Sequence, residues 1–125
     1  MILLVAALVA GWTPPPCKDN RSGGDARCAQ RDFSRVEAAM DKEFNRAVHH
    51  LRTCRPANAT KCDDMPRAVM LLRKEQQAWR AWRDAKCDVV TFGVEKTSAE
   101  SQVRLDCRSG MTVERSRELA QIVTR

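Results

Sequence analysis

The chain has 125 residues and a formal net charge of +6, and this length suits one small domain. Hydrophobic residues make up 43% and charged residues 30%, which excludes both a disordered tail and an integral membrane protein. The three Trp and three Phe, without any Tyr, are too few aromatic residues for a typical β-sandwich. Six Cys in so short a chain favour a small exported domain whose helices are crosslinked by disulfides.

Residues 1–10 form an unbroken apolar run. It is shorter than the roughly 20 residues that span a bilayer, but it suits the core of a secretory signal. We therefore expect residues 1–11 to be a signal-peptide remnant, residues 12–24 a polar, Pro-rich segment, and residues 25–125 the helical domain. Export would place the domain in the periplasm or outside the cell. A buried N-terminal helix is the alternative, and a lipid anchor at Cys17 is disfavoured by Pro16 before it.

Residues 28–51 are predicted to form a half-buried helix. Their apolar side chains share one arc at about 100° per residue, and these are Phe33, Val36, Met40, Phe44, Ala47, Val48 and Leu51. Pro56 stops this helix, so residues 53–64 are expected to form a loop.

Residues 66–90 are predicted to form a second helix, with Pro66 in its first turn. Its apolar arc comprises Ala68, Leu71, Leu72, Trp79, Trp82, Val89 and Val90. A capping box at residues 97–100 begins a third helix, whose looser arc contains Leu105, Met111, Thr112, Leu119, Ile122 and Val123. Short connections make neighbouring helices antiparallel, so we expect an all-α, up-down-up three-helix bundle.

Residues 76–87 are the most distinctive stretch. Trp79 and Trp82 lie three positions apart and are predicted to supply much of the core. Arg83, next to Asp84, falls at the edge of the apolar arc, where an unpaired guanidinium would be costly. We expect a structural ion pair with Asp32 or Glu37 of the first helix, in preference to a ligand-binding role.

This stretch resembles the helix-two signature of the N-terminal domain of LprI-like lysozyme inhibitors, which are small exported bacterial proteins. The matching positions are Gln76, Ala78, Trp79, Arg83, Asp84, Ala85 and Cys87. Upstream, Cys28-Ala29 and residues 41–45 resemble the family's pattern, and downstream so do Cys107, Thr112, Arg115 and Leu119. The chain departs from the pattern at Glu75, Arg80 and Trp82, and Cys54 and Cys62 look like an addition. The resemblance implies a protein without enzymatic activity that binds a lysozyme-type glycosidase and occludes its cleft.

The six Cys are expected to form three disulfides, although spacing alone leaves several pairings open. We predict nearest neighbours, which are Cys17–Cys28, Cys54–Cys62 and Cys87–Cys107. A rival set joins Cys28 to Cys87, because the start of the first helix and the end of the second lie together in an antiparallel pair. Zinc binding by His49, His50, Cys54 and Cys62 is disfavoured, since adjacent helical histidines diverge by about 100°.

Charge points to a second candidate surface. The 66–90 segment contains six basic and three acidic residues, and Arg73, Lys74 and Arg80 share its polar side. This side is either an ordinary solvated face or a partner-binding stripe. The alternative function is therefore a cell-envelope binding or structural module that contacts anionic polymer or an envelope protein. We find no pattern typical of catalysis, and we expect no metal, cofactor or nucleic-acid partner.

Overall fold

The computed structural model describes residues 24–53 and 65–124, and it contains three helices in this part of the chain: α2 (Gly24–Arg52), α3 (Met65–Thr91) and α4 (Glu100–Val123). The described residues include no strand, so the predicted all-α class is confirmed. The first helix begins at Gly24, within the segment that was expected to be non-helical. The predicted signal remnant at residues 1–11 and most of the 53–64 loop lie outside the described residues.

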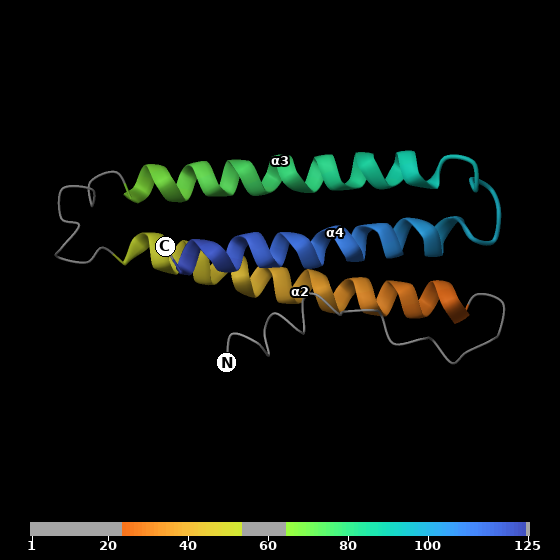
Figure 1. Cartoon of the computed structure of the whole chain (residues 1–125), viewed down its shortest axis with the longest axis horizontal. Helices are drawn as coiled ribbons and strands as arrows, with labels where there is room; N and C mark the ends of the chain where they lie inside the picture. The colour runs from red at the N-terminus through yellow and green to blue at the C-terminus, as the bar shows by residue number, and fades with distance from the viewer. Residues whose placement is uncertain (1–23, 54–64, 125) are drawn as a thin grey trace.

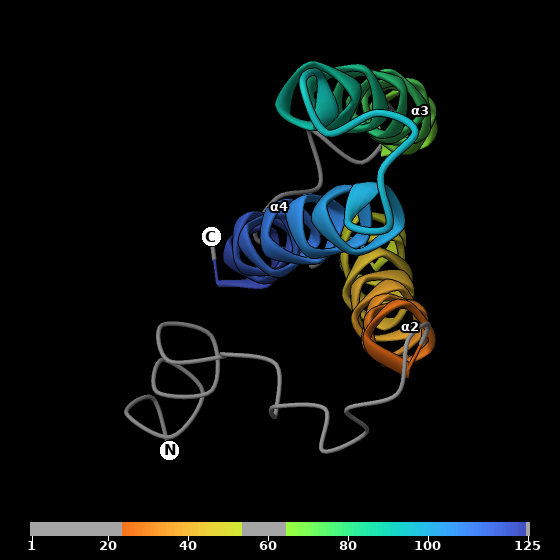
Figure 2. The ribbon, with the colours of Figure 1, turned by 90° about the vertical axis from the view of Figure 1, so that its right-hand side faces the viewer.

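The three helices are arranged in the predicted up-down-up order. In Figure 1, α2 and α4 run in one direction and α3 runs in the other. The α2–α4 pair is the most extensive of the three helix contacts. Figure 2 shows α3 lying along one side of that pair, so a large part of its surface faces away from the bundle. None of the described helices has the length and apolar content needed to cross a bilayer.

An apolar core lies where the end of α2 meets the start of α3 and the end of α4. Its buried members are Met40, Ala47, Val48, Val69, Leu72 and Leu119, and the partly buried Phe44, Leu51, Trp79 and Ile122 pack against them. Within α2, the predicted apolar arc is the buried one, since Val36, Met40, Ala47 and Val48 are all buried. Burial of this arc explains why the α2 segment could be predicted as a half-buried helix.

The middle of the bundle is polar. The buried polar residues are Asp32 of α2, Gln76, Arg83 and Thr91 of α3, and Ser109, Thr112 and Arg115 of α4. Four of them, Gln76, Arg83, Thr112 and Arg115, form hydrogen bonds between helices, so this part of the fold depends on pairing as well as on apolar area.

Trp82 does not belong to the core, and the prediction that it does is wrong. Its exposed fraction is 54%, whereas Trp79 is partly buried. The buried residues of α3 centre on Gln76 and Arg83, roughly 90° around the helix from the centre of the predicted apolar arc at 100° per residue. Polar partners on the other two helices therefore set the rotation of α3.

The connection from α3 to α4 also differs from the prediction. Gly93 and Lys96 have φ angles of 98° and 62°, in the left-handed region that favours glycine. Helix α4 begins at Glu100, and its N-cap Ala99 makes no side-chain cap bond. The Lys96 backbone N donates to Glu100 Oε2 at 2.9 Å, while the Ala99 N donates to Thr97 Oγ1 at 3.3 Å. Glu100 thus binds a backbone N–H of the turn without completing a capping box.

Cys87 and Cys107 form a disulfide with a Cα–Cα distance of 5.6 Å. This bond joins the end of α3 to the first half of α4, as predicted from neighbouring positions, and it excludes the rival Cys28–Cys87 pairing. Cys28 is also disulfide-bonded. The predicted partner Cys17 and the predicted Cys54–Cys62 pair lie outside the described residues.

Candidate functional site

Arg83 lies at the centre of the polar layer and is 4% exposed. Its Nη1 donates to Glu37 Oε2 of α2 at 2.9 Å and to Thr112 Oγ1 of α4 at 3.0 Å. Its Nε donates to Asp84 Oδ1 at 2.9 Å. One guanidinium therefore joins all three helices, and of the two carboxylates considered from the sequence it pairs with Glu37.

Arg115 of α4 forms a second centre and is 5% exposed. Its Nε donates to Gln76 Oε1 at 2.9 Å, and its Nη1 donates to Glu75 Oε1 at 2.9 Å. The same nitrogen donates to Glu118 Oε2 at 3.0 Å. The Gln76 amide also reaches Met40 Sδ of α2 at 3.5 Å, so this centre joins all three helices as well.

Trp79 connects the two centres. The guanidinium carbons of Arg83 and Arg115 lie 5.2 Å and 5.6 Å from the centroid of its ring. The Arg83 guanidinium also lies 5.2 Å from the centroid of the Phe33 ring. Cation–π contacts of this kind are stronger when the cation is desolvated, as both arginines are here.

These contacts give the family-signature residues a structural role. Gln76, Trp79, Arg83, Thr112 and Arg115 contact one another, directly or through a shared neighbour, between α3 and the α2–α4 pair. Each polar group among them is nearly inaccessible to a partner. The polar residues among these five therefore hold the bundle together and offer little surface to a partner.

The three predicted partner-binding residues do not form one free stripe. Arg80 forms ion pairs with Glu37 and with Asp41, the latter at 2.7 Å, so it contributes to the α2–α3 interface. Arg73 is exposed, and its guanidinium lies 5.8 Å from the Phe44 ring centroid. Lys74 is exposed and makes no ion pair within the described residues. Only Arg73 and Lys74 therefore remain available on the surface.

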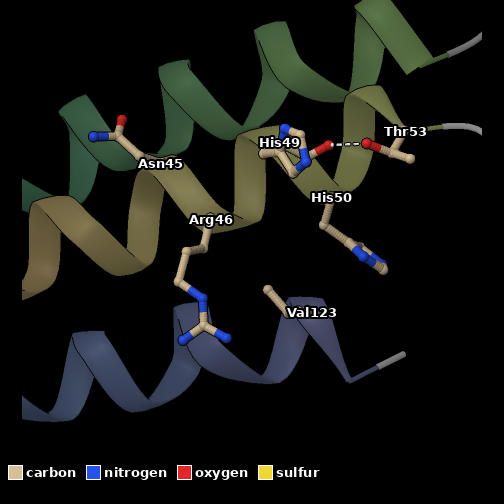
Figure 3. A pocket seen from close by; sticks show the side chains of 6 residues that line it. All are labelled: Asn45, Arg46, His49, His50, Thr53 and Val123. Carbon is tan, nitrogen blue, oxygen red and sulfur yellow. Dashed lines mark hydrogen bonds between the residues drawn. The ribbon is translucent and has the colours of Figure 1, made fainter.

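An open groove of about 470 Å³ lies between the ends of α2 and α4 (Figure 3) and is lined by Asn45, Arg46, His49, His50, Thr53 and Val123. Within it, Thr53 Oγ1 donates to the His49 carbonyl at 2.9 Å, and Arg46 pairs with Glu43 at 3.1 Å. No group of three His, Cys, Asp or Glu in residues 24–53 and 65–124 is placed to hold a metal ion. The groove is lined by polar side chains and Val123, without a carboxylate in its lining.

Two electrostatic features lie outside these centres. Partial burial raises the pKa of Asp106, and the negative charge of Asp32 raises it further. Hydrogen bonds from the Lys96 backbone and from Arg104 lower the pKa of Glu100. The first shift arises near Asp32 of α2 and the second in the α3–α4 turn.

Comparisons with known proteins agree with the family signature found in the sequence. An uncharacterized protein of Rhizobium meliloti (strain 1021) is 24% identical over 110 residues, which cover 87% of this chain and 79% of that protein. No solved structure matches the chain. The family model described as "Lysozyme inhibitor LprI" matches residues 17–119. That range covers most of the chain, including all of α2 and α3 and most of α4, and the chain therefore belongs to the LprI lysozyme inhibitor family.

Proposed function

We propose that this protein is an exported, non-enzymatic inhibitor that binds a lysozyme-type glycosidase and blocks its substrate cleft. The observation that carries the proposal is the LprI family match over residues 17–119. Inhibition by occlusion requires a stable surface and no catalytic group, which agrees with a site made of structural ion pairs.

The bonds between the helices support this mode of action. Arg83 and Arg115 each bond to more than one helix, and the Cys87–Cys107 disulfide ties α3 to α4. A surface that is ordered before binding loses little conformational entropy when a complex forms. An inhibitor built in this way can bind tightly through a small number of well-placed side chains.

The net charge of the chain predicts how inhibition of a basic lysozyme should depend on salt concentration. The chain has a net charge of +6, and a basic lysozyme would repel it at long range when salt is low. A cation placed between the paired catalytic carboxylates of the cleft would still be attracted at short range, where screening is weak. We expect inhibition of a basic lysozyme to strengthen as salt rises from low to moderate concentration.

The second candidate is a module that binds anionic polymer of the cell envelope. It is favoured by the outward cations of α3, since the exposed Lys74 has no ion-pair partner in the described part of the chain. Polymer binding through exposed charge would weaken steadily as salt rises, the opposite trend to that expected for inhibition of a basic lysozyme.

The experiment is lysis of cell-wall suspensions by lysozymes of the c, g and i classes, with and without the oxidised protein, across a salt series. The proposal expects stoichiometric inhibition of at least one class at micromolar protein. Absence of inhibition in every class, together with salt-sensitive retention on peptidoglycan or teichoic acid, would replace it with the envelope-binding function.

A further inference from the structure

The outer side of α3 presents an unusual run of apolar side chains. Leu71, Trp82 and Val89 are 50%, 54% and 74% exposed, and the exposed Ala78 and Ala85 lie between them. At about 100° per residue these five residues fall within one sector of roughly 60°. They form a stripe about 27 Å long at 1.5 Å per residue. We call these five residues the outer stripe.

The outer stripe is exposed because of the polar layer. Gln76 and Arg83 lie roughly 140° around α3 from the centre of the stripe, and both are bonded to α2 or α4. Turning the stripe into the core would carry Gln76 and Arg83 outward, break these bonds and leave the 5% exposed Arg115 of α4 without its Gln76 partner, which is strongly unfavourable. An exposed apolar stripe that the fold cannot bury is typical of an interaction site.

Charges on α3 are segregated around the stripe. Its three acidic residues each pair with an arginine of α4: Glu75 with Arg115, Asp84 with Arg108 and Asp88 with Arg104. These pairings neutralise the carboxylates of α3.

In contrast to the acidic residues of α3, several of its outward basic residues form no ion pair within the described part of the chain. Arg67, Lys74 and Lys86 are exposed, and no carboxylate within the described residues forms an ion pair with them. Lys74 and Lys86 flank the outer stripe on its two sides at helical spacing. The Lys86 Nζ lies 5.0 Å from the centroid of the exposed Trp82 ring. Two lysines therefore border the apolar stripe, and Glu75, the carboxylate nearest to the stripe, is paired with Arg115.

We propose that the outer stripe, with Lys74 and Lys86, is the surface that enters the cleft of the glycosidase, and this inference rests on the proposed function. The partner's chemistry is complementary, because a lysozyme-type cleft contains paired carboxyl groups about 5–10 Å apart. The Trp82 ring fills a subsite that otherwise holds a sugar ring, and Lys86 beside it binds one of the carboxylates. Buried aromatic anchors with adjacent charged hydrogen bonds are the usual centre of a tight interface.

The test measures inhibition constants of Trp82→Ala, Lys86→Glu and Lys74→Glu against the lysozyme class that the wild-type protein inhibits. Loss of a central aromatic anchor should weaken inhibition by about 30-fold or more. Reversal of either lysine should weaken it by about tenfold or more.

Two matched controls lie outside the surface. Phe92→Ala removes a 79% exposed aromatic ring in the α3–α4 turn, and Lys42→Glu reverses an exposed charge on α2. Each should change inhibition by less than about threefold. Circular dichroism and urea unfolding of all five variants check that the fold is intact, as expected for exposed positions.

The outcomes separate the two proposals. Wild-type inhibition that is unchanged by Trp82→Ala and by both lysine reversals would overturn the outer-stripe inference and leave the proposed function standing. Weakening by Phe92→Ala or Lys42→Glu to the same extent as by Trp82→Ala would also overturn it. Failure of the wild-type protein to inhibit any lysozyme would remove the proposed function and, with it, the inference.

Discussion

Arg83 Nη1 lies 2.9 Å from Glu37 Oε2, and this ion pair joins two residues that are 46 positions apart in the chain. Glu37 also binds Arg80, so one carboxylate of α2 receives two arginines of α3. The pair fixes how α3 is rotated on the bundle, because Arg83 is nearly inaccessible to solvent and cannot turn outward without losing its partners.

Replacement of Glu37 should destabilise the protein more than an equal change at an exposed ion pair. Glu37→Gln removes one of the two carboxylates paired with Arg83, and we expect a loss of about 2–4 kcal/mol in the free energy of unfolding. The matched control Glu43→Gln affects an i,i+3 pair with an exposed Arg46, for which we expect less than about 1 kcal/mol. Urea unfolding followed by circular dichroism measures both, and equal losses would contradict the structural role of the pair.

Arg115 allows a second comparison between the loss of a buried ion pair and the loss of an exposed one. Arg115→Met leaves Gln76, Glu75 and Glu118 without their shared donor, and we expect a loss of about 3–5 kcal/mol. Arg117→Met, two positions away, removes only a pair with Glu114 at 3.6 Å on the surface, so its effect should stay below about 1 kcal/mol. If Arg115→Met proved as mild as Arg117→Met, the second polar centre would have no role in stability.

Much of the architecture could be predicted from local pattern. The apolar spacing of residues 33–51 predicts the buried side of α2, because helical periodicity makes that side visible in the sequence. The pairing of Cys87 with Cys107, one of several that spacing left open, is the observed disulfide.

The rotation of α3 could not be predicted in the same way. Apolar residues occupy an arc centred between Trp79 and Trp82, and periodicity alone therefore places Trp82 in the core. The bonds that Gln76 and Arg83 make to distant residues decide otherwise. The edge position of Arg83 was the available signal, since a buried arginine requires partners on other helices.

Loss of the Cys87–Cys107 disulfide should lower stability by about 3 kcal/mol, because the bond closes a loop with a separation of 20 residues. The measurement is urea unfolding of the Cys87→Ala/Cys107→Ala variant against the oxidised wild-type protein.

Peptide mapping without reduction should in addition recover Cys17–Cys28 and Cys54–Cys62. A link between Cys28 and either Cys54 or Cys62 would contradict the predicted nearest-neighbour set.

The raised pKa of Asp106 predicts the direction in which the stability of the protein changes with pH. Its pKa is raised in the folded protein above the ordinary value of 3.8, first by burial and then by the charge of Asp32. The folded state therefore binds this proton more tightly than the unfolded state. The resulting stabilisation is full below about pH 3.8, the ordinary pKa of the unfolded chain, and it is lost as pH rises through the pKa of the folded state. Asp106→Asn should consequently raise the melting temperature at pH 7, and its advantage over the wild-type protein should shrink as the pH falls below 4.

The control for this comparison is Glu95→Gln, which changes an exposed carboxylate in the α3–α4 turn. Its effect on the melting temperature should be small at both pH values. A lower melting temperature for Asp106→Asn at pH 7 would show that the ionised carboxylate stabilises the fold, contrary to the assigned sign.

The most direct test of cleft occlusion is hydrolysis of a short, soluble oligosaccharide by a lysozyme that the protein inhibits on cell walls. An inhibitor that occupies the cleft blocks this hydrolysis at the same protein concentration that blocks lysis of cell walls, because both substrates need the same catalytic carboxylates. We predict matching inhibition curves for the two substrates, with saturation at one inhibitor per enzyme. Protection of cell walls with undiminished hydrolysis of the soluble substrate would show that the protein shields the wall polymer and would contradict occlusion of the enzyme.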